Sequence, residues 1–198
     1  GQNIPPLDRY LKRWVPRRIF KAGETPAYSN WGTTLAAYIV QRVSGQPFDT
    51  YVEGHIFAPI GMRTATFRQP LPPRLRGLMA TGQPLASEPA KPFEHIAPAP
   101  AGSMSASGLD MAKFMAAHLG GGRGLMRPET ATIMHNSPLD RVNSRSLVPP
   151  LNRMQLGFFD SNTNGRRVIG HLGDVQAFHT ALHLFPDERV GLYVSFSS

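Results

Sequence analysis

A tyrosine and an asparagine, two positions apart, stand in front of a helix-forming stretch. They belong to Tyr28-Ser29-Asn30, which follows the turn-forming run Gly23-Glu24-Thr25-Pro26. On a loop held by the next helix, a phenol can pass a proton if nearby cations lower its pKa, and an amide can orient a substrate carbonyl. A packed tyrosine beside a helix-capping asparagine would give the same tripeptide. The tripeptide alone therefore leaves both catalysis and structure open.

The second candidate is His171-Leu172-Gly173, which we expect to follow a strand at residues 167–169 and to lead into another. Glycine on a strand often marks the close approach of a ligand or of another backbone. A histidine beside it can donate to a substrate carboxylate or assist proton transfer. A packing histidine and a bulge glycine are the structural alternative.

The remaining polar candidates indicate structure. Ser103, Ser105 and Ser107 have no lysine at Ser-x-x-Lys spacing, and Ser107 fits a helix cap. His179 and His183 are four apart on an expected strand, which is not a helical metal pair, and no third ligand accompanies them. The chain contains no cysteine, which excludes disulfides, thiol catalysis and cysteine-ligated zinc. We predict no metal and no cofactor. The other histidines are scattered and are interpreted as surface or packing residues: His55, His95, His118 and His135.

Apolar periodicity predicts the helix that must hold the Tyr-x-Asn loop. Residues 31–44 carry apolar residues at spacings of four, and Gly45 supplies a C-terminal stop. A second helix is predicted after Pro47, with Pro59 at its end. The apolar positions of the first helix are Trp31, Leu35, Ile39 and Val43.

Helical patterns continue further along the chain. Ser107, with Asp110 three residues later, should cap a helix whose methionines belong to the core. One more short helix is expected at about residues 128–135, and a short amphipathic piece at residues 7–15. Residues 68–102 are rich in Pro, Ala and Gly, which predicts a long ordered loop, with a disordered linker as the alternative.

The pattern changes to strands after residue 151. Strands are predicted at residues 155–160, 167–169, 177–185 and 190–196, with a hairpin turn at Asn164-Gly165. Helices first and antiparallel strands last define an α+β class. We assign residues 1–150 to a mostly helical and loop region with the Tyr-x-Asn motif, and residues 151–198 to strands with the His-x-Gly motif. Together they form one incomplete domain.

The composition favours a packed protein with an excess of positive charge. The net charge is +8 and the pI is about 10.4, which is compatible with an anionic partner such as nucleic acid or a membrane surface. The cations cluster only at Lys12, Arg13, Arg17, Arg18 and Lys21. Because no aromatic-interleaved motif accompanies them, no nucleic-acid partner is predicted. No apolar run is long enough to span a membrane, so no membrane segment is predicted in this chain.

The ordered set of motifs resembles the β-lactamase-like, penicillin-recognising serine hydrolases. The similarity is almost continuous over residues 26–67 and touches most of the chain. Its markers are Pro26-Ala27-Tyr28-Ser29-Asn30-Trp31-Gly32, Val43-Ser44-Gly45-Gln46-Pro47-Phe48, Ile56-Phe57-Ala58-Pro59-Ile60-Gly61-Met62, Pro100-Ala101-Gly102-Ser103 and Gly170-His171-Leu172-Gly173.

The resemblance implies a partial β-lactamase/transpeptidase-like fold and an acyl-serine mechanism. In such a site Tyr28 would be the general base or proton relay, and Asn30 would contact the substrate amide. His171 would replace the lysine of the third motif. The backbone N–H of Asp174, just after Gly173, would be an oxyanion donor, a contact that contributes about 3–4 kcal/mol in the transition state. Gln176 and Ala177 stand where relatives often have glycine, which predicts a narrower pocket.

One motif of that family is missing. The four lysines are preceded, three residues earlier, by Arg9, Arg18, Glu88 and Asp110, so the chain holds no Ser-x-x-Lys. We therefore expect a fragment that begins after the nucleophile and stops before the final helix, and that is inactive alone. The alternative is a non-catalytic binding module, a pseudoenzyme of the same fold.

The resemblance also implies partners and compartment. Substrates would be small esters, β-lactams or D-amino-acid peptides, and histidine in the third motif favours esterase-like or peptidase-like relatives. The parent protein would be periplasmic or secreted. A sheet without its covering elements should expose apolar surface, which predicts self-association.

Overall fold

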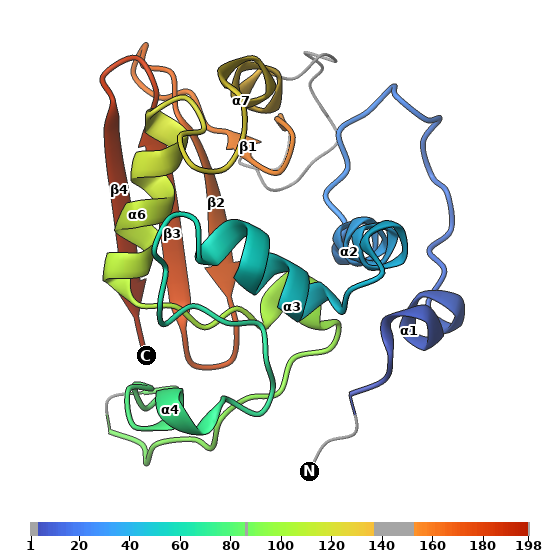
Figure 1. Ribbon diagram of the computed structural model, residues 1–198, viewed down its shortest axis with the longest axis vertical. Coiled ribbons are helices and arrows are strands. Elements are labelled where there is room, and N and C mark those ends of the chain that lie inside the picture. The colour runs from blue at the N-terminus through green and yellow to red at the C-terminus, as the bar shows by residue number, and fades with distance from the viewer. Residues whose placement is uncertain (1–3, 86, 137–152, 198) are drawn as a thin grey trace.

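The helices precede the sheet, as expected from the order of patterns. A computed structural model describes residues 4–85, 87–136 and 153–197 (Figure 1). The predicted boundary between residues 1–150 and 151–198 falls among residues outside these ranges. Helical elements are α1 (Leu7–Arg13), α2 (Asn30–Ser44), α3 (Phe48–Val52), the π-helix η1 (Glu53–Phe57), α4 (Pro73–Arg76), α5 (Ala99–Gly102), α6 (Gly108–Leu119) and α7 (Pro128–His135).

Helix α2 forms where predicted but buries a different face. Ser29 caps its N-terminus by accepting from the N–H of Gly32, and Gly45 ends it at φ 70°, a left-handed conformation that glycine adopts without a Cβ clash. Thr34 and Ala37 are buried, whereas Ile39 and Val43 are 53% and 83% exposed. The predicted apolar face was therefore wrong at its C-terminal half, because neighbouring elements cover α2 along the line of Thr34.

The next elements follow the predicted helix closely. Pro47 precedes α3, and η1 continues it to Phe57. Between them, Glu53 accepts from the guanidinium of Arg68, which also pairs with Asp49 at 3.0 Å. Residues 68–102 are mostly loop, as expected, interrupted by α4 and α5.

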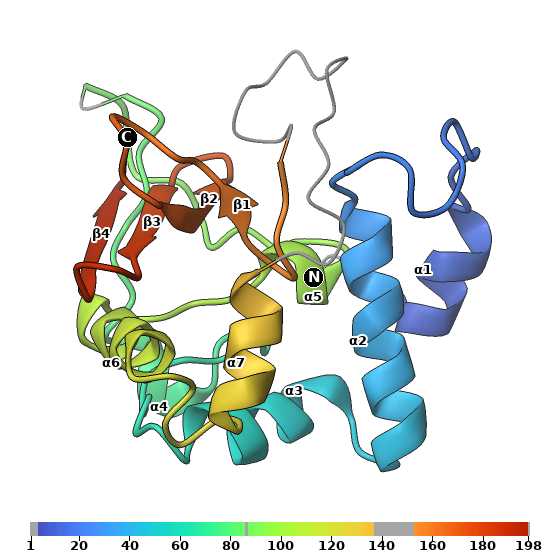
Figure 2. The same cartoon turned by 90° about the horizontal axis from the view of Figure 1, so that it is seen from above.

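Helix α6 covers one face of the sheet. Ser107 caps it in a capping box with Asp110, as predicted. Met111 and Met115 are buried against the sheet, which confirms that the methionines of this helix belong to the core. Figure 2 shows α6 and α7 on the same side of the strands.

The sheet contains four antiparallel strands in the order β1-β2-β3-β4. They are β1 (Phe159–Asp160), β2 (Ile169–Asp174), β3 (His179–Phe185) and β4 (Val190–Phe196). The last two confirm the predictions, and Asn164 and Gly165 make the predicted turn at φ 52° and 73°. Two predictions were wrong. The strand predicted at 155–160 has only the two residues of β1. The strand predicted at 167–169 instead spans Ile169–Asp174, so that His171 and Gly173 lie inside β2.

The two faces of the sheet differ in cover. Ile169, Leu182 and Leu184 point toward α6 and are at most 5% exposed. On the opposite face the alternate residues of β4 are 45–55% exposed: Val190, Leu192, Val194 and Phe196. The exposed apolar sheet surface expected from the sequence is therefore present. In the part of the chain that the structure describes, no helix is long and apolar enough to cross a membrane.

Candidate functional site

Tyr28 and His171 come together from opposite ends of the chain. The centroids of their rings lie 5.7 Å apart, and the Tyr28 ring meets Phe159 edge-on at 5.5 Å. Burial raises the pKa of Tyr28, so the phenol remains protonated at neutral pH. Among the residues that the structure describes, no cation lowers this pKa as the sequence analysis required, so Tyr28 is a proton donor in the ground state.

Asn30 is the first residue of α2, and its side chain does not cap the helix. Ser29 does that, while the backbone carbonyl of Asn30 accepts from the hydroxyl of Thr34 at 2.7 Å. The side chain of Asn30 is exposed. The structural explanation offered for Asn30, a helix cap, is therefore wrong, and its amide makes no hydrogen bond with the residues that the structure describes.

The imidazole of His171 is held in one tautomer. Nδ1 lies 2.6 Å from the carbonyl oxygen of Leu172, and because a carbonyl only accepts, Nδ1 carries the proton. Burial lowers the pKa of His171 against the opposing effect of this hydrogen bond. A neutral ring with Nδ1 protonated leaves Nε2 as an acceptor. Donation to a carboxylate, one option raised by the sequence, would require a second proton.

The backbone N–H of Asp174 is directed to an open edge of β2. The N–H of Val175 donates to the carbonyl of Phe178 at 3.1 Å, and bonded and non-bonded pairs alternate along an antiparallel ladder. The next pair, Asp174 with His179, is therefore non-bonded, so the N–H of Asp174 points away from β3. On that side β1 pairs with Ile169 and Gly170, and no other described strand pairs with β2 there.

Gly173 keeps the face of β2 clear next to His171. A Cβ at this position would meet the hydroxyl of Thr180 at 2.4 Å, on the face that His171 shares. A side chain here would therefore have to displace Thr180. The missing side chain leaves the backbone of β2 accessible beside the histidine.

Phe159 joins the two motifs and was missed from the sequence. It is 3% exposed, and its ring stacks on His171 at 4.6 Å with an interplanar angle of 24°. Strand β1 brings it there by pairing Phe159 with Gly170. A signal existed in the adjacent Phe158-Phe159 before the Asn-Gly hairpin, but the register that selects Phe159 depends on the fold.

A loop packs against the β2–β3 turn at the end of this site. Glu94 accepts from the backbone N–H of Gln176 at 2.9 Å, and Gly82 lies so close to Ala177 that a Cβ would come within 2.7 Å. Ala177 is buried and Gln176 exposed. The narrower pocket predicted from these two residues stays a prediction.

The other histidines lie elsewhere. His118 and His135 form a buried pair with Nδ1 and Nε2 2.9 Å apart, which agrees with a packing role. Their rings meet Phe158 at 5.2 and 5.6 Å. His179 bonds to the carboxylate of Asp174 on the face opposite His171. Among the residues that the structure describes, no three histidines or carboxylates gather as a metal site.

Helices packed on an antiparallel sheet, with a Tyr-x-Asn loop against a His-x-Gly strand, define a class: the serine hydrolases of the β-lactamase fold. Residues 3–198 match the Beta-lactamase family. The chain belongs to this family, which confirms the resemblance and the α+β fold.

Individual relatives are longer than this chain. Human beta-lactamase-like 1 is 27% identical over an alignment of 176 positions, which covers 83% of this chain and 32% of that protein. The octameric penicillin-binding protein homologue from Pyrococcus abyssi superposes with a TM-score of 0.72 at 22% identity over 91% of this chain. The β-lactamase/D-alanine carboxypeptidase from Pseudomonas syringae gives 0.73 at 18% over all of it. The chain spans 40% and 61% of those two structures.

Proposed function

We propose that these 198 residues form the receiving part of an acyl-serine site that acts on esters, β-lactams or D-amino-acid peptides. The observation that carries this is the contact between Tyr28 and His171, two motif residues distant in sequence with rings 5.7 Å apart. The chain holds no Ser-x-x-Lys, so the nucleophile would come from outside it. The parent protein would then be periplasmic or secreted.

The shifts of the two pKa values support distinct roles. A protonated Tyr28 phenol can donate to a leaving group, and a neutral His171 can accept a proton at Nε2. The pKa of one group is raised and that of the other lowered, so both stay in these states at neutral pH. Asn30 would orient the substrate amide, and the N–H of Asp174, next to Gly173, would stabilise the oxyanion.

The proposal is tested in a protein that contains both this chain and the segment with the nucleophilic serine. Tyr28→Phe should reduce acylation by a fluorescent penicillin, an aryl ester or a D-amino-acid amide about 10²–10⁴-fold. Tyr38→Phe, on the middle of α2, is the matched control and should retain full activity. Equal rates for both variants would remove Tyr28 from the mechanism.

A non-catalytic binding module remains the second candidate, favoured by the missing Ser-x-x-Lys. The isolated chain should not be labelled covalently by a fluorescent penicillin or a fluorophosphonate. Rapid labelling would contradict its inactivity alone. Reversible binding of the penicillin without labelling, even when the preceding segment is present, would support the binding module.

The open face of β4 supports self-association through the sheet. Four apolar side chains there are about half exposed, and contiguous apolar patches of this kind mark interaction surfaces. Sedimentation should show concentration-dependent association that Leu192→Ser with Val194→Thr reduces. A chain that stays monomeric at all concentrations would refute self-association through the sheet.

A further inference from the structure

A second surface of the molecule is basic and also exposes apolar side chains. Residues 9–23, named here the basic segment, carry six lysines and arginines and no carboxylate. Asp8 and Glu24 stand at its two ends, where they pair with Lys12 and Lys21 at 3.8 and 3.6 Å. Both pairs are largely exposed, so they neutralise the segment only weakly.

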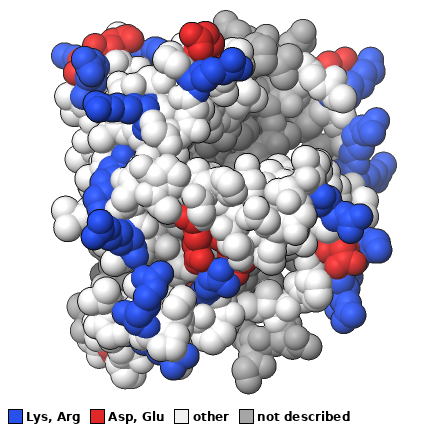
Figure 3. Space-filling view, viewed as in Figure 1, with Lys and Arg blue, Asp and Glu red and all other residues white. Residues whose placement is uncertain are grey.

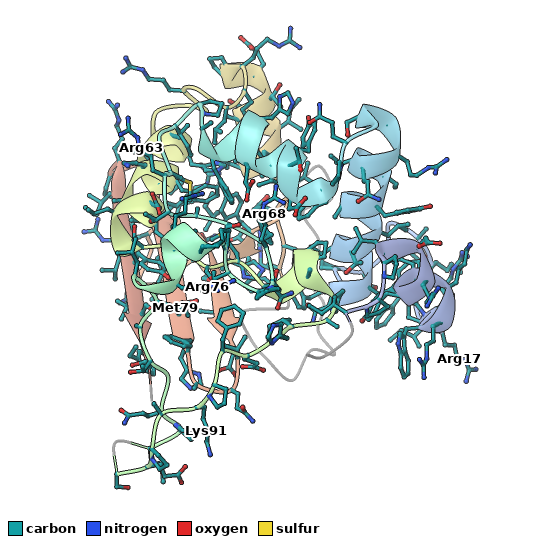
Figure 4. The ribbon with its side chains drawn as sticks, turned by 60° about the horizontal axis from the view of Figure 1, so that its bottom comes forward. Arg17, Arg63, Arg68, Arg76, Met79 and Lys91 are labelled. Carbon is teal, nitrogen blue, oxygen red and sulfur yellow. The ribbon has the colours of Figure 1, made fainter. Side chains whose placement is uncertain are left out.

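Three apolar side chains of the basic segment are among the most exposed of the described residues. Trp14 is 58% exposed, Val15 68% and Ile19 75%. Arg17 and Arg18, which stand between Val15 and Ile19, are exposed and make no ion pair with any residue that the structure describes. Figure 3 shows cations gathered along the side of the molecule formed by α1, and Figure 4 shows Arg17 at its periphery.

The fold holds the basic segment at both ends and leaves its middle on the surface. On one side α1 is fixed to α2 by a hydrogen bond from the indole N–H of Trp31 to the carbonyl of Leu11. On the other side Ser29 caps α2. Between them the chain follows no helix or strand from Val15 to Phe20, with Pro16 in the middle.

We propose that the basic segment docks on the surface of an anionic lipid bilayer. Lysine and arginine are attracted to anionic headgroups, and tryptophan and aliphatic side chains enter the interface beneath them. Nucleic acid would use the cations but would leave Val15 and Ile19 exposed to water. The interleaving of both kinds of side chain therefore favours a bilayer. This docking does not depend on the proposed hydrolase activity.

The experiment is co-sedimentation of the purified chain with lipid vesicles. At about 0.15 M salt, vesicles with roughly one-third phosphatidylglycerol in phosphatidylcholine should bind it, and pure phosphatidylcholine should not. R17Q/R18Q/K21Q should weaken binding about 100-fold, since each cation near the surface contributes about 1 kcal/mol. W14S/I19S should weaken it at least about tenfold with the charge intact.

The matched control is R42Q/R123Q/R127Q, which removes three exposed arginines outside the basic segment. It lowers the net charge equally and should leave binding nearly unchanged. Circular dichroism of every variant checks that the fold is intact. An equal loss in the control would overturn the proposal in favour of attraction by net charge. Failure to bind the anionic vesicles would overturn the proposal as well. So would the finding that the chain binds duplex DNA and that W14S/I19S weakens neither DNA binding nor vesicle binding.

Discussion

Two adjacent phenylalanines separate two histidine clusters with opposite properties. Phe158 packs against both His118 and His135, whose ring nitrogens bond to each other. Phe159 stacks on His171, whose Nδ1 donates to the backbone carbonyl of Leu172 and whose Nε2 makes no hydrogen bond with the residues that the structure describes. A histidine paired inside the core contributes to stability, whereas one with a free acceptor nitrogen is available for chemistry.

Among these variants, Phe158→Ala should cause the largest loss of stability. This side chain is 4% exposed in the core, so its removal should lower the free energy of unfolding by about 3–5 kcal/mol. Urea denaturation followed by circular dichroism measures it. Leu156→Ala, two residues earlier and 48% exposed, is the control and should cost less than about 1 kcal/mol. Similar losses in both variants would show that the first cluster does not hold the fold.

Acid should destabilise the protein through the same cluster. Burial, with a smaller effect of His135, lowers the pKa of His118 to about 4 from an ordinary 6.5. Between these values the unfolded chain binds a proton that the folded protein does not, so stability falls as the pH falls from 6.5 to 4. The difference corresponds to about 3 kcal/mol.

Urea denaturation at several pH values distinguishes this cause from the protonation of carboxylates. His118→Gln should flatten the fall between pH 6.5 and 4, because glutamine does not titrate. It can still bond to His135, whose pKa is lowered by burial and then by Arg167. An unchanged slope in the variant would assign the acid sensitivity to other groups.

Phe159→Leu should have a smaller effect on stability and a specific effect on the site. Leucine keeps most of the apolar volume but loses the stacking on His171, which contributes about 1 kcal/mol. The ring resonances of His171 in an NMR spectrum should shift when the stacked ring is removed. Phe48→Leu removes another aromatic contact, with Phe67 at 5.1 Å, and should leave His171 unaffected. Equal spectra for His171 in both variants would separate Phe159 from the site.

The sequence predicts local structure where short-range signals agree. Gly45 and Asn164-Gly165 mark a helix end and a turn through backbone geometry that few other residues adopt, and Ser107 marks a helix start through its side-chain hydroxyl. Each of these predictions is confirmed. The site motifs were also visible, since Tyr28 and His171 belong to recognisable patterns. Phe159 was not, because its role depends on a strand register between distant residues. The prediction of the buried face of α2 was wrong for the same reason, because the elements packed against a helix determine which of its faces is buried.

The smallest change in stability should follow from His171→Leu, and it separates the two clusters most clearly. Among the described residues His171 hydrogen-bonds only to the carbonyl of Leu172, so its loss leaves none of their side chains unpaired. We expect a loss of no more than about 1 kcal/mol, the contribution of its stacking on Phe159. His118→Leu removes a ring of similar size but leaves the buried Nε2 of His135 without its partner, which should cost about 1–3 kcal/mol. Residues kept for chemistry are often neutral or costly for stability, and residues kept for packing are not. If urea denaturation gave His171→Leu the larger loss, His171 would be a structural residue, and the site built around it would have to be abandoned.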